Sequence, residues 1–179
     1  MGKTAAELMA ELANDGEYQA KKKAKDDYFS NLERIYADDE GGLVEELNQA
    51  GFLVTSVWDF VNSKNYYSDA VPILIKHLKT KHHPKILAGL ARSLAVTQFS
   101  NNDDLWNLLV DLYEKTLSDS EINNPVERGL QEAIAVALEC LAIESRIDSL
   151  KKLVATVPNG DGIHWLKNKL NKSVKKSNT

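Results

Sequence analysis

The chain has little that would interrupt regular structure: one cysteine, four prolines and nine glycines among 179 residues. The lone Cys140 excludes a disulfide within the chain, and its place in the apolar run 135–142 predicts a small buried side chain. This cysteine usage fits a reducing cytosol. Alternating runs of Val, Ile and Thr are also missing. The apolar residues instead recur at spacings of three and four, which predicts helices almost throughout.

Long apolar runs are absent as well. No stretch approaches the roughly 20 apolar residues that a membrane-spanning helix requires. Residues 1–7 become charged quickly and lack the apolar core of a secretory signal. These features predict a soluble, cytoplasmic protein with no membrane partner. At 179 residues, with 43% hydrophobic content, the chain is long enough for one domain with a substantial core.

The net charge of −4 conceals a strong segregation of charge along the chain. Residues 1–42 carry six basic and ten acidic side chains, and residues 43–98 carry six and four. Residues 99–142 carry two and nine, whereas residues 143–179 carry eight and three. One interpretation is that these are solvated helix faces. The other is that residues 99–142 form an acidic face for a basic partner, because summed charge steers association.

Helix signals begin at the N-terminus. Thr4 and Glu7 form a predicted capping box, and a longer helix is predicted over residues 17–36. The middle of this helix, with the basic run 21–25, is expected to be a solvated surface, whereas its end carries an apolar stripe that is expected to dock. Residues 37–42 are interpreted as a linker. The stripe consists of Tyr28, Phe29, Leu32, Ile35 and Tyr36.

A sequence echo predicts a repeat architecture. Residues 89–96 read Gly-Leu-Ala-Arg-Ser-Leu-Ala-Val, and 40 residues later Gly129 and Leu130 begin a stretch with Ala and Val in register. A period near 40 in a helix-patterned chain is typical of helical-pair repeats. We predict three hairpins, each a longer helix with Ala and Gly followed by a shorter Leu-rich helix. The predicted helix pairs are 43–62 with 69–80, 84–98 with 103–117, and 124–143 with 145–157.

These elements predict one domain with two parts. Residues 1–42 form an N-terminal helical extension and linker, and residues 43–179 form the repeat region, which a last helix from Ile163 closes. Stacked hairpins are needed because neither helix of a pair buries its stripe alone. Gly51 costs roughly 1 kcal/mol relative to Ala within a helix, so a close neighbour is expected there. Asp103 is the predicted cap of its helix.

Four stretches of the chain resemble HEAT-repeat proteins, in particular a family of small bacterial HEAT-like proteins. They are 4–8, 57–62 with the following Tyr66-Tyr67, 70–78 and 89–96. The resemblance implies an all-α fold, a right-handed α-solenoid of about three HEAT-like helical hairpins with an N-terminal helical extension and a C-terminal capping helix. It also implies a non-catalytic binding scaffold, since some HEAT-like proteins resemble immunity proteins of bacterial toxin systems. Other HEAT-like proteins are DNA glycosylases that act on alkylated bases.

Signatures of catalysis and of metal binding are missing. The spacing of His77, His82 and His83, even with Asp69 nearby, does not match a zinc site. Cys140 lies in an apolar helix rather than in an electropositive cleft. No phosphate-binding glycine loop and no nucleophile motif occurs. The sequence therefore predicts no catalytic residue, no metal and no cofactor.

Nucleic-acid binding of the glycosylase type is the alternative function. It needs a basic groove, aromatic side chains that hold a base and a carboxylate in the groove. Trp58 and Asp59 could supply the last two, although Trp58 also suits the core. The acidic segment 99–142 would repel a phosphate backbone, which disfavours this alternative. Lysines of the last helix, from Lys167 onward, are the better nucleic-acid candidates, and they equally suit the helix dipole.

A surface for a protein partner is the favoured interpretation. The second helices of stacked hairpins commonly line the concave face, so exposed aromatic and acidic side chains there are the natural contacts. A basic bacterial toxin, bound through the acidic segment 99–142, is the specific partner that we expect. The alternative for the two tyrosines is packing against a neighbouring hairpin. The predicted partner-binding residues are Tyr66, Tyr67, Asp103, Asp104, Trp106, Asp111 and Glu114.

Overall fold

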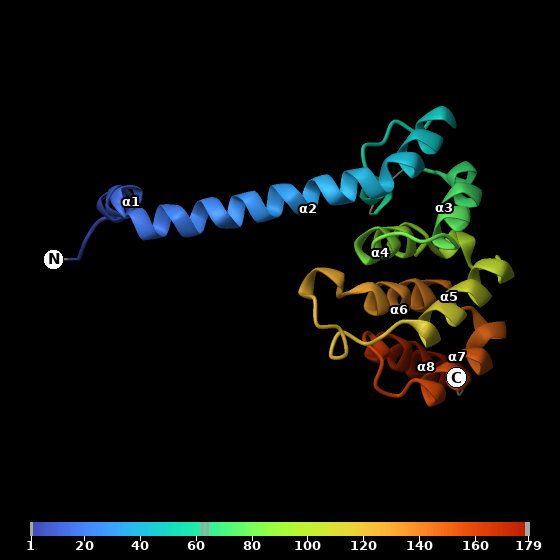
Figure 1. Ribbon diagram of the computed structural model, residues 1–179. Helices are drawn as coiled ribbons and strands as arrows, with labels where there is room; N and C mark the ends of the chain where they lie inside the picture. The colour runs from blue at the N-terminus through green and yellow to red at the C-terminus, as the bar shows by residue number, and fades with distance from the viewer. Residues whose placement is uncertain (1, 62, 64, 178–179) are drawn as a thin grey trace. The chain divides into compact units, whose positions relative to one another are not determined.

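The computed structural model is built from helices (Figure 1). It describes residues 2–61, 63 and 65–177, and within these ranges it contains no strand, which confirms the predicted all-α class. The chain divides into two compact units, residues 1–38 and 39–179. All the described helices of these ranges are too short or too polar to span a membrane.

The first unit begins with helix α1, Ala5–Asn14, and contains the start of α2, Gly16–Gln49. The predicted capping box is confirmed, because the Thr4 side chain accepts a hydrogen bond from the Glu7 N–H and the Glu7 carboxylate accepts one from the Thr4 N–H. Asp15 then restarts the helix, with its Oδ1 accepting from the N–H of Glu17 at 2.9 Å and of Tyr18 at 3.1 Å.

The predicted linker 37–42 is wrong, because α2 continues through it to Gln49. Two glycines weaken a helix by roughly 1 kcal/mol each. Burial offsets this cost, since Leu43 and Leu47 are completely buried at helical spacing. Glu40 is also buried, and its carboxylate accepts hydrogen bonds from the Ser56 hydroxyl and the Val57 N–H, both at 3.0 Å.

The predicted helix 43–62 is also wrong, because α2 ends within it. Gly51 adopts a left-handed φ of 93°, its N–H donates to the Asn48 carbonyl, and the Phe52 N–H donates to the Leu47 carbonyl. This pair of bonds is the Schellman arrangement that ends a helix at a glycine. The chain then reaches a short 3₁₀ helix, η1, Val57–Phe60, which Ser56 and Asp59 cap.

Further helices follow among the described residues of the second unit. The predicted helices beginning near residues 71, 84, 103, 147 and 163 are all present, and short 3₁₀ turns lie between them. The α-helices are α3 Val71–Leu78, α4 Pro84–Ser93, α5 Asp103–Lys115, α6 Leu130–Leu141, α7 Ile147–Thr156 and α8 Ile163–Ser177. The 3₁₀ turns are η2 Ser68–Ala70, η3 Thr97–Phe99, η4 Pro125–Glu127 and η5 Glu144–Arg146.

The helices pair differently from the prediction. Helix α3 packs mainly on α4, α5 on α6 and α7 on α8, whereas α4, α6 and α8 form a row that η1 extends at one end (Figure 1). In each observed pair, the helix that belongs to the row comes second in the chain. The predicted hairpins instead paired α4 with the following α5, and α6 with the following α7. The row α4–α6–α8 is one layer of helices and α3, α5 and α7 pack on it, and α4 carries most of the repeated stretch 89–96.

The two glycines of the echo have different structural roles. Gly89 lies within α4, where a Cβ atom would be 2.6 Å from Val57 Cγ1 and 2.9 Å from Trp58 Nε1. Gly129 precedes α6 in a left-handed conformation, φ 90°, with open space around its Cα. The predicted helix 124–143 is consequently broken at Arg128–Gly129 into η4 and α6. The echo reflects close packing at one position and a chain reversal at the other.

Hydrogen bonds from buried polar side chains hold two loops of the second unit against the core, the segment after α5 and the turn before α8. The buried Gln131 donates to the carbonyls of Tyr113 and Thr116, at 3.2 Å and 2.8 Å, and accepts from the Asp161 N–H at 2.7 Å. The Tyr113 hydroxyl donates to the Asp161 carbonyl at 3.0 Å. Tyr113 and Gln131 thus hold the segment after α5 and the turn before α8 against α6.

Candidate partner-binding surface

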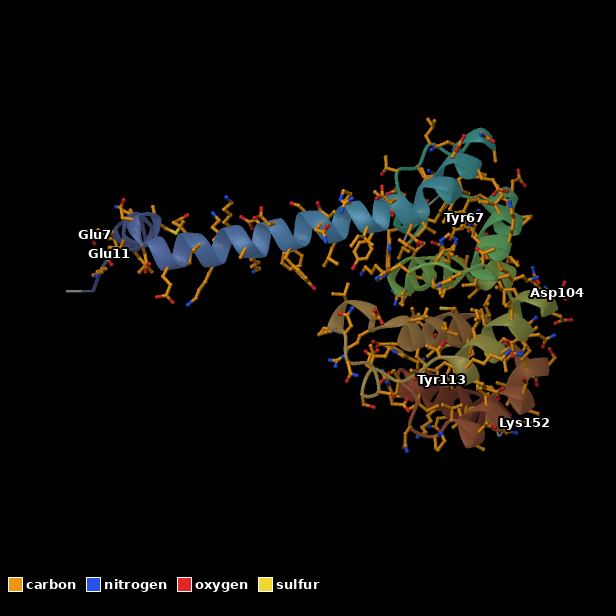
Figure 2. The ribbon with its side chains drawn as sticks, viewed as in Figure 1. Glu7, Glu11, Tyr67, Asp104, Tyr113 and Lys152 are labelled. Atoms are coloured by element: carbon orange, nitrogen blue, oxygen red, sulfur yellow. The ribbon has the colours of Figure 1, made fainter. Side chains whose placement is uncertain are left out.

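Helix α5 carries five of the seven residues predicted to contact a partner. It begins after Asn102, whose Oδ1 accepts from the Leu105 N–H at 2.9 Å, so Asn102 rather than Asp103 is the cap. Leu105 and Leu109 point into the core, and both are fully buried. The acidic face of α5, which we define as Asp104, Asp111 and Glu114, is exposed as predicted. Figure 2 labels Asp104 on this face.

Trp106 belongs to the core, whereas Asp103 is exposed and forms an ion pair. Trp106 is 3% exposed, contrary to the expectation of a surface aromatic, and its Nε1 donates to Ser149 Oγ at 3.2 Å. The Arg146 guanidinium lies over the Trp106 ring, 5.0 Å from its centroid, and donates to Asp103 Oδ1 at 2.8 Å and to the Leu141 carbonyl. Trp106 therefore links α5 to α7, and Asp103 links α5 to Arg146 of η5.

Of the two predicted tyrosines, Tyr67 is buried and Tyr66 is exposed. Tyr67 is buried, contrary to the expected exposure, and its hydroxyl donates to the Ser93 carbonyl at 2.7 Å. Burial raises the pKa of Tyr67 above its ordinary value of 10.0. Its ring lies 4.8 Å from that of Phe60 and 5.9 Å from that of Phe99, measured between centroids. Packing against neighbouring elements, the alternative for the pair, applies to Tyr67.

Tyr66 is 73% exposed and borders a small pocket of about 130 Å³. The pocket lies where the chain before η2 meets the turn around η3. Among the seven predicted residues, the structure thus exposes Tyr66, the acidic face of α5 and Asp103, of which Asp103 is paired with Arg146. Residues of both segments line the pocket: Ser63, Asn65, Tyr66, Tyr67, Val96, Gln98 and Phe99.

Tyr28, Phe29 and Ile35 of the apolar stripe on α2 are exposed, although the sequence predicts that the stripe docks, whereas Leu32 and Tyr36 are half-buried. Within residues 5–38, no described side chain is buried. Tyr28 and Phe29 are each half exposed, with their rings in edge contact at a centroid distance of 5.6 Å. Helix α1 adds two further apolar side chains, since Leu8 and Met9 are exposed too. The first unit, taken by itself, therefore has amphipathic helices and no buried core among its described residues.

The charges around the stripe are mostly acidic. Residues 26–38 carry Asp26, Asp27, Glu33 and Asp38 against a single Arg34. The run 21–25 is basic, as predicted for a solvated surface, and Lys21 forms an exposed ion pair with Glu17 at 2.6 Å. A partner that covers the stripe would meet apolar groups bordered by carboxylates.

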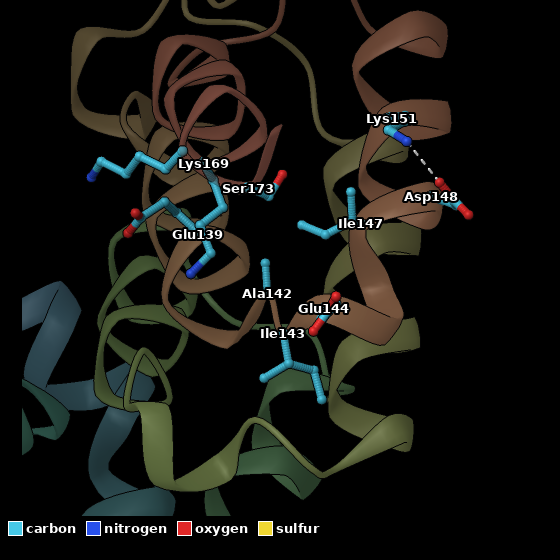
Figure 3. A pocket seen from close by; sticks show the side chains of 10 residues that line it. Glu139, Ala142, Ile143, Glu144, Ile147, Asp148, Lys151, Lys169 and Ser173 are labelled. Carbon is cyan, nitrogen blue, oxygen red and sulfur yellow. Dashed lines mark hydrogen bonds and ion pairs between the residues drawn. The ribbon is translucent and has the colours of Figure 1, made fainter. Parts of the chain in front are cut away.

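A second hollow is lined by residues of α6, α7 and α8 and of the connection between α6 and α7 (Figure 3). This groove of about 730 Å³ has Ala142, Ile143 and Ile147 between its walls. Three lysines and three acidic residues line it, including the Asp148–Lys151 ion pair at 2.9 Å. Its mixed charge selects no ligand class, and no sequence pattern indicates it. The remaining lining residues are Glu139, Glu144, Lys169, Lys172 and Ser173.

The residues considered for chemistry are hydrogen-bonded or half-buried within the fold. Asp59, the candidate glycosylase carboxylate, accepts from the N–H groups of Thr55 and Ser56, and the Thr55 bond contributes most to lowering its pKa below 3.8. Trp58 is half-buried, with Lys85 Nζ 4.6 Å from its ring centroid. Cys140 is half-buried, and burial raises the pKa of its thiol above 9.0.

No cluster of three or more His, Cys, Asp or Glu side chains suited to a metal ion occurs among the described residues. Comparison with known proteins finds no matching family model, no matching curated protein and no matching solved structure. The chemistry of the exposed surfaces is therefore the basis for any functional proposal.

Proposed function

We propose that the chain is a non-catalytic protein-binding scaffold, in which a HEAT-like α-solenoid carries a helical arm that binds the partner. The arm is defined as residues 5–38. The observation that supports this proposal is the absence of any buried side chain among the described residues of the arm. Monomeric proteins rarely leave contiguous apolar surface uncovered, and such surface commonly marks an interaction site.

Helix energetics also favour a partner for the arm. A helix without tertiary packing is only marginally stable in water, because most helical stability in proteins comes from burial of an apolar face. The stripe presents Tyr28, Phe29 and Ile35 at spacings that place them along one face. Aromatic side chains of this kind commonly dominate binding energy. An amphipathic helix of this type binds by laying its apolar face into a groove of another protein.

The charge of the arm supports a basic partner. Carboxylates outnumber basic groups around the stripe, and the acidic face of α5 offers a second surface of the same sign. A basic bacterial toxin with an apolar groove has the complementary chemistry, in which case the chain acts as an immunity-type protein. The row α4–α6–α8 with its paired helices α3, α5 and α7 supports the solenoid part of the proposal.

The test is affinity capture from the cells that produce this protein, with each bound protein quantified by mass spectrometry. Phe29→Glu and Ile35→Glu place charges in the stripe, whereas Ser30→Glu adds the same charge to the opposite face of the exposed helix. We expect the two stripe variants to reduce capture of a basic protein about tenfold or more, and Ser30→Glu to leave it unchanged.

A second set of variants separates the arm from the acidic face of α5. Asp104→Lys and Asp111→Lys reverse two charges that are not part of the Arg146 contact. Retained capture by the stripe variants, together with loss on these reversals, would move the binding site from the arm to α5. Retention by every variant would overturn the proposal.

A further inference from the structure

Two histidine rings at the connection between α3 and α4 point their nitrogen atoms at each other. His77 Nδ1 lies 3.0 Å from His82 Nε2, and the ring centroids are 5.3 Å apart. This centroid separation results when both nitrogens lie close to the line that joins the ring centres. The contact therefore has the geometry of a straight hydrogen bond. The side chains are only 14% and 9% exposed, so water does not replace this contact freely.

The outer nitrogen of each ring contacts a carboxylate of α2. His77 Nε2 lies 3.0 Å from Glu46 Oε2, and His82 Nδ1 lies 3.1 Å from Asp39 Oδ2. The two carboxylates are seven residues apart, which places them on one face of the helix. The hydrogen bond from Lys76, followed by that from His77, holds the pKa of Glu46 below its ordinary value. An ionised carboxylate only accepts hydrogen bonds, so each outer nitrogen must carry a proton.

These contacts constrain how many protons the two rings can hold. With both outer nitrogens protonated, two neutral rings would face each other with two lone pairs at 3.0 Å. Two fully protonated rings would instead face each other with two N–H groups. Only one proton between the rings makes the contact attractive. We propose that His77 and His82 share a single proton, and that this proton closes a pH-sensitive latch between α2 and the α3–α4 connection.

The surrounding charges are balanced by one shared proton. Asp39 and Glu46 contribute two negative charges from α2, and Lys76 of α3 contributes one positive charge through its 2.7 Å contact with Glu46. The shared proton supplies the second positive charge. From the connection itself, the His83 N–H donates to Asp39 Oδ2 at 2.9 Å.

Other titratable groups of the neighbouring elements are directed elsewhere. The His83 ring nitrogen Nδ1 accepts from the Lys85 N–H at the start of α4. Lys79 and Lys81, on the connection, are exposed, and Glu45 of α2 accepts from Gln49.

A proton suits the site better than a metal ion. Histidines that bind metals also commonly donate their second nitrogen to a carboxylate. However, two nitrogens bound to one ion must direct their lone pairs at a common point about 2 Å from each. Nitrogens aligned head-on at 3.0 Å leave no room for an ion between them. The described residues also provide no third ligand of the usual kinds, because no cluster of three occurs among them.

The latch makes one stretch of α2 responsive to pH. In the closed latch the two rings hold three protons, one on each outer nitrogen and one shared between the inner nitrogens. Addition of a fourth proton in acid, or loss of the shared proton in alkali, opens the contact and frees α2 between Asp39 and Glu46 from the connection. This inference does not depend on the proposed binding function, because every group involved lies within residues 39–85.

The test follows the imidazole nitrogens by NMR across the pH range, in the full chain. We expect the signals of His77 and His82 to change together, and His82→Gln to alter the titration of His77. His164→Gln is the matched control, since His164 is exposed on α8. Independent titration of His77 in wild type and in His82→Gln would overturn the proposal. So would displacement of the proton by one equivalent of Zn²⁺, which would identify a metal pair.

Hydrogen exchange provides a second readout that does not require a histidine to be replaced. At neutral pH, Glu46→Gln and Asp39→Asn remove charge at nearly constant volume, so the shared proton loses its balancing carboxylate. We expect the amides of residues 39–49 to exchange about tenfold faster, the effect of losing one charge-assisted hydrogen bond. Glu45→Gln is the matched control on the same helix. Equal exchange rates in Glu45→Gln and Glu46→Gln, with unchanged helical circular dichroism, would contradict the latch.

Discussion

At Gly89 the backbone of α4 approaches η1 so closely that there is no space for a side chain. A Cβ atom there would lie 2.6 Å from Val57 Cγ1 and 2.9 Å from Trp58 Nε1. The Ser93 hydroxyl, one turn further along α4, donates to the Val57 carbonyl at 2.9 Å and fixes the same approach. Val57 and Ser93 are completely buried and Trp58 is half-buried, so these groups cannot move without opening the core.

We predict that Gly89→Ala destabilises the fold by up to about 2 kcal/mol, because overpacking typically costs about 1–3 kcal/mol. This cost exceeds the roughly 1 kcal/mol that alanine gains over glycine within a helix. Gly41→Ala is the matched control, because Gly41 lies in α2, where a Cβ atom would have no neighbour within 4 Å. Gly41→Ala should therefore stabilise. Urea denaturation compares the two variants, and equal midpoints would show that η1 moves away without cost.

At the scale of elements, one ion pair joins α5 to η5, just before α7, with very unequal burial of its partners. The Arg146 side chain is 5% exposed, whereas that of Asp103 is 87% exposed. Water therefore screens the carboxylate, and such pairs contribute little. The guanidinium has two other contacts, with the Leu141 carbonyl and with the face of Trp106.

We predict that Arg146→Ala costs about 2–4 kcal/mol of stability, because it empties a buried site and removes the cation–π contact. Asp103→Ala should cost about 1 kcal/mol or less. Asp104→Ala, one residue along and exposed, is the control and should be neutral within about 0.5 kcal/mol. Thermal or urea unfolding measures all three. Equal losses for Arg146→Ala and Asp103→Ala would mean that the ion pair, rather than packing, holds α5 to η5.

For the whole molecule, the spacing of apolar residues was sufficient to predict an all-helical fold and most helix starts. Helix ends were harder to predict, because glycine has several uses. Gly51 resembles a tolerated interior glycine in the sequence, yet it ends α2 in a left-handed conformation. Residues 37–42 resemble a linker, yet burial of Leu43 and Leu47 extends the helix through them. Both outcomes depend on tertiary packing that local patterns do not contain.

The prediction of the binding surface was limited by the same dependence on tertiary packing. Tyr67 and Trp106 are amphipathic side chains that suit either a core or an interface. Their burial depends on partners 26 and 43 residues away, Ser93 and Ser149. The repeat phase also depended on distant contacts, because α4 packs most extensively on α6, which is not its neighbour in the chain. The domain boundary, the solenoid and the binding function remain predictions.

The stability of the whole chain depends on pH, and acid and alkali act on different groups. Glu46 and Asp59 have pKa values below their ordinary 4.5 and 3.8. Their contributions to stability are complete above those values, and are lost as pH falls through the lower folded values. Burial, and then the charge of Asp161, raises the pKa of Tyr113 from 10.0 to about 12. The Tyr113 contribution is therefore complete below pH 10 and is lost as pH rises to about 12.

We expect Tyr113→Phe to lower stability by about 1 kcal/mol at neutral pH, through loss of the bond to the Asp161 carbonyl. The variant should also lose less stability than wild type above pH 10, because its buried ring has no proton to release. Tyr67, whose pKa is also raised, keeps part of the alkaline loss in both proteins. Urea midpoints measured from neutral pH to about 12, with absorbance titration of the tyrosinates, test this difference. Parallel profiles for the two proteins would show that Tyr113 ionises as readily in the fold as in the unfolded chain.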